Sequence, residues 1–157
     1  SRGNINRHSH GLSWPASKPR RSAVGKSGDA ALIPIVDGVE LTELVRVFET
    51  DSEYEPAGGY AGIVPANFRF GELNAYFMGD DTDAWPRPGV IWLLGCDCGE
   101  VGCWPLEPRV TRQGPVVRWS GFRQPYRPDR DYSGFGPFAF DGAEYRSTVA
   151  AAISALP

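Results

Sequence analysis

The sequence predicts an α+β fold, a single domain in which about three helices pack on a small, largely antiparallel sheet. Two segments begin with an aspartate followed three positions later by a glutamate, a pattern typical of helix amino termini. The apolar run VIWLLG (90–95) has the length of a buried strand. The runs LEPRVTR and PVVRWSGF flank Gln113 and Gly114, as the strands of a hairpin would.

Each element follows from a local signal along the chain. ALIPIV (31–36) predicts a short strand that leads into the first helix, GVELTELVRVFE (38–49), with Asp37 and Glu40 as a capping box. A second helix is expected from Phe70 to Met78, ended by Gly79 in the left-handed conformation. The last helix, GAEYRSTVAAAISAL (142–156), follows Asp141 and has Glu144 three residues later.

The first thirty residues differ in composition from the rest. They contain six Lys or Arg residues and one acid, and their apolar residues follow no period. Such a segment buries too little surface to offset its ordering entropy. We therefore expect 1–30 to be a basic, disordered tail and 31–157 to be the single α+β domain. No apolar run approaches the roughly 20 residues of a membrane span, so we expect no membrane partner.

Both histidines, His8 and His10, fall in this tail. A domain without histidine lacks the usual base for a serine or cysteine nucleophile, so the sequence argues against that class of enzyme. Enzyme activity stays open, but the sequence favours none. Residues 31–157 contain ten arginines against eighteen acids, a net charge of −8. A surface of this charge attracts a basic partner and repels phosphate.

The segment GCDCGEVGCW (95–104) contains all three cysteines, Cys96, Cys98 and Cys103. We favour a tight turn made by its glycines, with small cysteines filling the space beneath Trp104 and no cofactor. Zinc is an alternative, although three thiols leave the fourth ligand to Asp97, Glu100, water or a tail histidine. A disulfide from Cys103 to Cys96 or Cys98 would leave an odd cysteine, and neighbouring acids disfavour a reactive thiolate.

Arginines alternate with aromatic residues between positions 118 and 132, which is typical of interface anchors and of single-strand nucleic-acid binding. The residues that we predict to bind a partner are Trp119, Phe122, Arg123, Gln124, Tyr126, Arg127 and Tyr132.

The elements GCDCGEVGCWPL and WSGFRQPYRPDRDYSGFGPFAF, with the last short helix, resemble a family of small, uncharacterised bacterial proteins that are frequent in actinobacteria. The resemblance covers about residues 31–157. It implies a bacterial and cytoplasmic setting and carries no activity.

Together these observations predict a non-catalytic protein-binding module of a bacterium, an inhibitor or immunity-type protein that acts on a basic partner. Two alternatives stay open. One is a metal- or thiol-dependent protein that uses Cys96, Cys98 and Cys103. The other is nucleic-acid binding through the basic tail and the loop 118–132.

Overall fold

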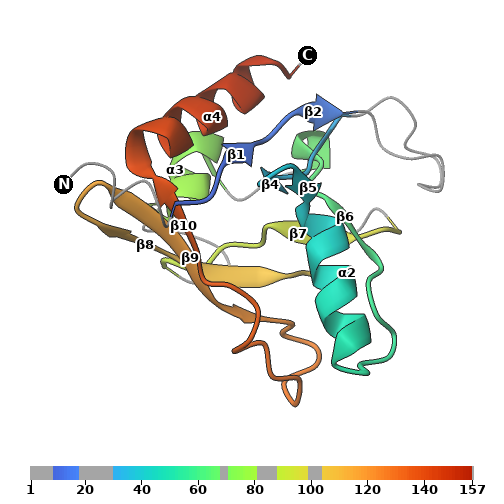
Figure 1. Ribbon diagram of the computed structural model, residues 1–157. Coiled ribbons are helices and arrows are strands. Elements are labelled where there is room, and N and C mark those ends of the chain that lie inside the picture. The colour runs from blue at the N-terminus through green and yellow to red at the C-terminus, as the bar shows by residue number, and fades with distance from the viewer. Residues whose placement is uncertain (1–8, 18–29, 68–70, 81–87, 99–103, 157) are drawn as a thin grey trace.

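The fold is α+β, as the sequence predicts: in the residues that the structure describes, three α-helices pack against small antiparallel sheets (Figure 1). The computed structural model describes residues 9–17, 30–67, 71–80, 88–98 and 104–156. Its helices are α2 (Leu41–Asp51), α3 (Leu73–Met78) and α4 (Gly142–Ser154), with a 3-10 turn at Pro65–Asn67. None of the helices in these residues is long and apolar enough to cross a membrane. The strands are β1 (Leu12–Ser13), β2 (Ala16–Ser17), β3 (Ala31–Leu32), β4 (Ile35–Val36), β5 (Val39–Glu40), β6 (Tyr60–Gly62), β7 (Leu94–Cys96), β8 (Glu107–Gln113), β9 (Val116–Arg123) and β10 (Phe138–Asp141).

The predicted hairpin is confirmed and forms the main sheet, in the order β10-β9-β8. Gly114 turns the chain between β8 and β9 with a positive φ of 60°. Backbone bonds continue the sheet beyond both edge strands. Leu93 N donates to Leu106 O at 2.9 Å beside β8, and His10 N donates to Ala139 O at 2.7 Å beside β10. The run VIWLLG is therefore only partly a regular strand. Its first half lies beside β8, with which it makes an isolated bridge, and its end, β7, pairs with β6.

One of the two predicted helix caps is confirmed. The Asp141 carboxylate accepts the Glu144 amide at 3.0 Å and opens α4. The capping box at Asp37 is wrong, because Asp37 and Gly38, with φ of 51° and 85°, form the two-residue turn between β4 and β5. An Asp-Gly pair with two positive φ values suits such a hairpin turn. The helix α2 then begins at Leu41.

The third predicted helix is present but shorter than expected. The helix α3 begins at Leu73, because the Glu72 carboxylate accepts the amides of Asn74 and Ala75. Gly79 ends it with a φ of 72°, as predicted. Phe70, with which this helix was expected to begin, lies outside the described residues.

The expected boundary between tail and domain at residue 30 is wrong for residues 9–17. Leu12 and Trp14 are 8% and 3% exposed and belong to the main core. They alternate with Gly11 and Ser13 on an extended segment, so both point to the same side. Residues 1–8 and 18–29 lie outside the described part.

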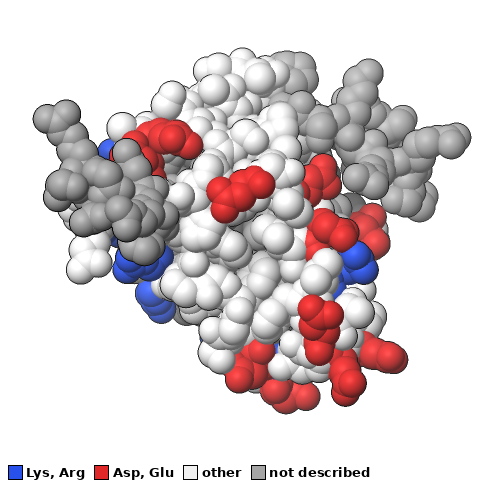
Figure 2. All heavy atoms as spheres, in the orientation of Figure 1, with Lys and Arg blue, Asp and Glu red and all other residues white. Residues whose placement is uncertain are grey.

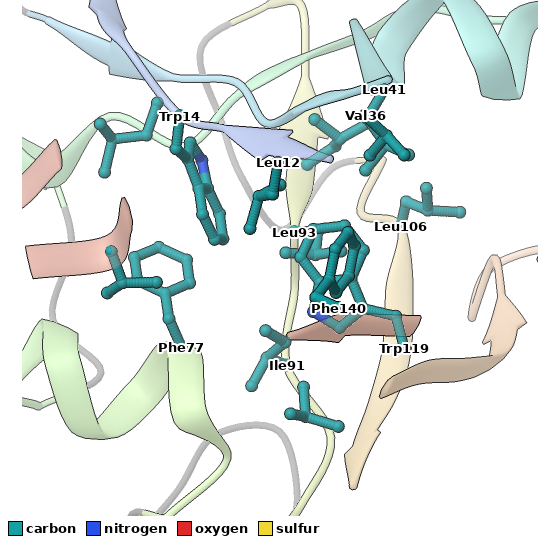
Figure 3. Close-up of a cluster of buried hydrophobic side chains, with 14 of the residues drawn as sticks. Leu12, Trp14, Val36, Leu41, Phe77, Ile91, Leu93, Leu106, Trp119 and Phe140 are labelled. Carbon is teal, nitrogen blue, oxygen red and sulfur yellow. The ribbon is translucent and has the colours of Figure 1, made fainter. Parts of the chain in front are cut away.

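The core lies between the inner face of the main sheet, the helices α3 and α4, and the segment 9–17. Trp119 from β9 and Phe140 from β10 meet at its centre with ring centroids 4.7 Å apart (Figure 3). The Tyr145 hydroxyl accepts from Trp119 Nε1 at 3.0 Å and donates to Phe77 O at 2.6 Å. These two bonds tie the sheet to both helices.

Candidate functional site

The residues predicted to bind a partner divide into two groups. Arg123, Tyr126 and Arg127 are exposed, with Tyr126 at 52%. The prediction of a surface role is wrong for the other four, which are at most 5% exposed: Trp119, Phe122, Gln124 and Tyr132.

The reason is the alternation of β9. Trp119 faces the core, and the positive φ of 60° at Gly121 coincides with a shift in the pairing of β8 and β9. Such a bulge reverses the side that each later residue faces. Phe122 and Gln124 therefore point inward and Arg123 points outward. Arginine alternating with aromatic residues here reflects a half-buried strand.

Below the exposed residues lies a buried carboxylate that the sequence analysis did not single out. Glu49, in the last turn of α2, is fully buried. Its Oε2 accepts the hydroxyls of Tyr60 at 2.7 Å and Tyr132 at 2.5 Å, and lies 3.3 Å from Arg130 Nη1. Its Oε1 accepts the Gly58 amide at 2.7 Å. We call Glu49, Tyr60, Gln124, Arg130 and Tyr132 the Glu49 cluster.

The Glu49 cluster keeps its tyrosines protonated. Burial raises the pKa of Tyr132 to about 12, with a further contribution from its hydrogen bond to Glu49. Burial also raises the pKa of Tyr60, and the charge of Glu49 adds to the effect. Tyr60 donates to Glu49 while accepting from Gln124 Nε2 at 3.3 Å. Each tyrosine hydroxyl therefore donates a hydrogen bond to the Glu49 carboxylate, and these bonds hold the segments around Tyr60 and Tyr132 next to α2.

This cluster holds together two loops, residues 52–58 after α2 and residues 124–132 after β9. Arg130 Nη2 donates to Pro56 O at 2.9 Å. The Tyr54 hydroxyl accepts the Asp131 amide at 2.8 Å and donates to Asp131 O at 3.1 Å. Gln124 Oε1 accepts the Tyr126 amide at 3.1 Å. The exposed side chains therefore stand on loops that buried groups fix in place.

Trp104 covers the edge of the cluster. Its Nε1 donates to Gly58 O at 2.9 Å, and its ring lies 6.3 Å from that of Tyr60. Two guanidinium groups lie over the indole, Arg127 at 4.9 Å and Arg130 at 5.6 Å from its centroid. Arg127 is exposed and Arg130 is buried, so the indole contacts one cation at the surface and one in the interior.

The sequence contains one signal that points to Glu49. Leu41, Val45 and Glu49 follow one another at intervals of four, and all three are fully buried. A glutamate on the apolar face of a helix needs partners inside the protein. Those partners come from residues up to 83 positions away in the sequence, so they could not be named from it.

Exposed carboxylates surround the two loops. Figure 2 shows acidic side chains gathered at the end of the molecule where these loops lie in Figure 1, while most of the visible arginines lie on another side. We call this set the acidic end; its exposed members are Asp51, Glu53, Glu55, Asp129 and Asp131.

The cysteines are only partly placed. Cys96 ends β7 and is half-buried, Cys98 is exposed, and Cys98 N lies 3.5 Å from Cys96 Sγ. The turn between them is held by a bond from Asp97 N to Gly59 O at 3.0 Å. Cys103 lies outside the described residues, and within those residues no three His, Cys, Asp or Glu side chains are placed to hold a metal ion. A zinc site stays a prediction.

The prediction of a domain without histidine is wrong, because His10 is part of the fold. Its ring is half-buried and meets Phe138 edge-on at 5.2 Å, and Nδ1 lies 3.3 Å from Ala139 O. These contacts give His10 a structural place beside β10.

Comparison of the chain with protein-family models, with curated proteins and with solved structures finds no match. The resemblance to an actinobacterial family is therefore untested.

Proposed function

We propose that this chain is a non-catalytic protein-binding module that binds a basic partner through its acidic end. The observation that carries the proposal is the placement of five exposed carboxylates on and beside two loops that the Glu49 cluster holds in position. Carboxylates fixed before binding lose little conformational entropy when a partner arrives, which favours affinity. Their summed charge also favours fast encounter with a basic protein.

The exposed residues Arg123, Tyr126 and Arg127 are proposed as anchors within this surface. Arginine and tyrosine contribute strongly to protein interfaces because they combine apolar area with directional hydrogen bonds. Arg123 is half exposed and its Nε lies 3.6 Å from Oε2 of the buried Glu107, which restrains the guanidinium. Arg127 rests on the Trp104 indole. Both cations are therefore restrained, and two cations do not cancel the charge of the five exposed carboxylates.

The test compares three immobilised full-length chains in capture from a bacterial lysate: the wild type, the triple variant Glu53→Lys, Glu55→Lys, Asp129→Lys, and the control Glu144→Lys. Glu144 is exposed on α4, away from the acidic end. We expect the wild type and control to retain a basic protein that the triple variant loses. With that protein purified, the dissociation constant should rise at least about tenfold for the triple variant and in high salt.

Two results would contradict the proposal. One is a retained set that is the same for all three chains. The other is a captured partner whose affinity depends on Cys96 or Cys98 and not on the acidic residues. Binding of a single-stranded oligonucleotide by the full chain, measured in the same buffer, would instead favour the nucleic-acid alternative.

A further inference from the structure

Residues 9–17 cover the edges of three strands, β3, β4 and β10, and Gly11 also exchanges two hydrogen bonds with Asp37. The strand β1 pairs with the edge of β4, Leu12 opposite Val36, and β2 pairs with β3, Ser17 opposite Ala31. The amide of His10 donates to Ala139 O at 2.7 Å, on the outer side of β10. An uncovered strand edge is a template for pairing with another extended chain. This segment therefore occupies positions that any strand of matching sequence could occupy.

The segment is anchored by the side chain of Trp14. Its ring lies 4.6 Å from that of Phe77, 5.8 Å from that of Trp119 and 6.4 Å from that of Tyr145, measured between centroids. Figure 3 shows Leu12 and Trp14 pointing from the segment into the core. We call the residues that receive the segment the acceptor surface: Val36, Phe77, Trp119, Ala139 and Tyr145.

The acceptor surface is held together without the segment. The Tyr145 hydroxyl joins Trp119 Nε1 to Phe77 O, as described above, and α3 and α4 pack on each other. The pairing of β9 with β10 fixes Trp119 against Phe138 and Phe140. None of these contacts uses a residue from 9–17. The surface can therefore keep its shape while the segment is exchanged.

Burying Trp14 costs free energy because its indole N–H lacks a hydrogen bond, unlike those of the other described tryptophans. Trp92, Trp104 and Trp119 donate their Nε1 protons to Glu107, Gly58 O and Tyr145. Trp14 Nε1 is buried and has no hydrogen-bond partner among the described residues. A buried donor without an acceptor regains its hydrogen bond to water when it is released. The segment is thus bound less tightly than its buried area suggests.

We propose that residues 9–17 are an exchangeable strand and that the acceptor surface also binds the same segment of a second copy of this chain. A second copy supplies the same side chains and backbone groups, so every contact of the segment is reproduced between chains. When two copies exchange segments, each acceptor surface binds residues 9–17 of the other copy, and the result is a closed dimer. The acceptor surface involves α4 and β10 and is separate from the acidic end, so this inference does not depend on the proposed function.

The length of the connection from Ser17 to Ala31 decides which segment is bound. These residues are paired opposite each other, and thirteen residues join them. A connection of that length closes within one chain, where the effective concentration is on the order of millimolar. Deleting residues 18–29 leaves only Ala30, whereas a hairpin needs about two connecting residues. The shortened chain can pair its β2 only with the β3 of another copy.

The experiment measures the mass of two deletion variants in solution by light scattering. The deletion of 18–29 should give a folded dimer with about twice the mass of the control. The control, a deletion of 20–27, leaves five connecting residues and should be a folded monomer. Adding Trp14→Ala to the longer deletion should raise the dimer dissociation constant at least about tenfold, because the anchor is lost.

Two outcomes would overturn the proposal. A folded monomer after deletion of 18–29 would show that the acceptor surface does not recruit the segment of a second copy. A chain that stays unfolded at every concentration after that deletion, while the control folds, would show that the segment acts only within its own chain. As a second measurement, the full-length Trp14→Ala variant should bind a labelled peptide of residues 9–17 at least about tenfold more tightly than the wild type does, because its own segment competes less.

Discussion

The two ends of the molecule hold their irregular segments by different physical means. At the acidic end, the loops 52–58 and 124–132 are joined by hydrogen bonds and charge around the buried Glu49. At the other end, residues 9–17 are held by the packing of Leu12 and Trp14 and by short backbone pairings with neighbouring strands, without a buried charge. Hydrogen bonds to a buried charge are directional and fail together when one partner is removed. Apolar packing is not directional and tolerates replacement by a similar segment.

This difference suits the two roles that we propose. A surface that recognises a partner by fixed charges benefits from loops that do not move, and the Glu49 cluster provides that rigidity. A segment that exchanges between copies has to leave without disturbing the rest, and a packed anchor with backbone pairings that a second copy can reproduce allows this. Four variants or conditions test the contrast.

Replacing Glu49 by alanine should destabilise the protein most. The change leaves the Arg130 guanidinium buried and uncompensated and removes the acceptor of Tyr60, Tyr132 and the Gly58 amide. Loss of one partner from a buried pair of this kind costs about 3–5 kcal/mol. The measurement is the free energy of unfolding from urea titration.

Glu43→Ala is the matched control, because Glu43 pairs with Arg46 on the exposed face of the same helix, where both side chains are about half exposed. Its cost should be much smaller than that of Glu49→Ala, because an exposed ion pair contributes little to stability. Equal losses for the two variants would mean that the cluster is not what holds the loops.

Raising the pH should weaken the acidic end next. The folded protein raises the pKa of Tyr132 to about 12, whereas an unfolded tyrosine titrates near 10. Between these values the folded state binds more protons than the unfolded state, so stability falls as the pH rises. The stabilisation is complete below pH 10 and is lost as the pH rises through about 12.

The measurement is the fall in unfolding free energy between about pH 9 and pH 11.5. Tyr132→Phe should make that fall smaller. Tyr126→Phe is the control, because Tyr126 is 52% exposed and lies outside the Glu49 cluster, and it should leave the fall as it is in the wild type. The same dependence on pH in all three proteins would remove Tyr132 from the explanation.

Two tryptophans in the same core test the other end. Trp119→Phe removes the donor to the Tyr145 hydroxyl, whereas Trp14→Phe removes a buried donor that has no acceptor. Both changes delete similar apolar volume, so the difference reports the hydrogen bond. We expect Trp119→Phe to be the more destabilising by about 1 kcal/mol or more in urea titration. Equal costs would indicate that the Trp14 N–H is hydrogen-bonded in solution, which would weaken the argument for exchange.

Local signals in the sequence predict much of this fold. The hairpin around Gly114, the cap at Asp141 and the end of α3 at Gly79 each depend on residues within a few positions. The pair Asp37 and Gly38 was misinterpreted because an aspartate before a helical pattern and an Asp-Gly hairpin turn look alike in sequence. Residues 9–17 were missed because two-residue strands are too short to show a period.

The candidate site was harder to predict for a different reason. The alternation of arginine and aromatic residues in 118–132 fits an interface and a half-buried strand equally well, and only the sheet shows that Trp119 and Phe122 face inward. The Glu49 cluster brings together residues from α2, β6 and the loop after β9. Its donors are far apart in sequence, so their convergence on one carboxylate requires the tertiary structure.

The smallest effect on stability should come from replacing Arg127. Arg127 and Arg130 lie over the same Trp104 indole, but Arg127 is exposed whereas Arg130 is buried against Glu49. An exposed cation over an aromatic ring contributes about 0.5–1 kcal/mol. Arg127→Ala should therefore lower the unfolding free energy by no more than that, while Arg130→Ala, which leaves Glu49 buried without its cation, should cost about 3 kcal/mol or more.

The same variant also tests binding. If Arg127→Ala weakens capture of a basic partner, the cation anchors that partner; stronger capture would mean that it only offsets the neighbouring carboxylates. A loss of stability from Arg127→Ala as large as that from Arg130→Ala would show that the two arginines act as one unit, and the division between a fixed interior and an exposed recognition surface would have to be abandoned.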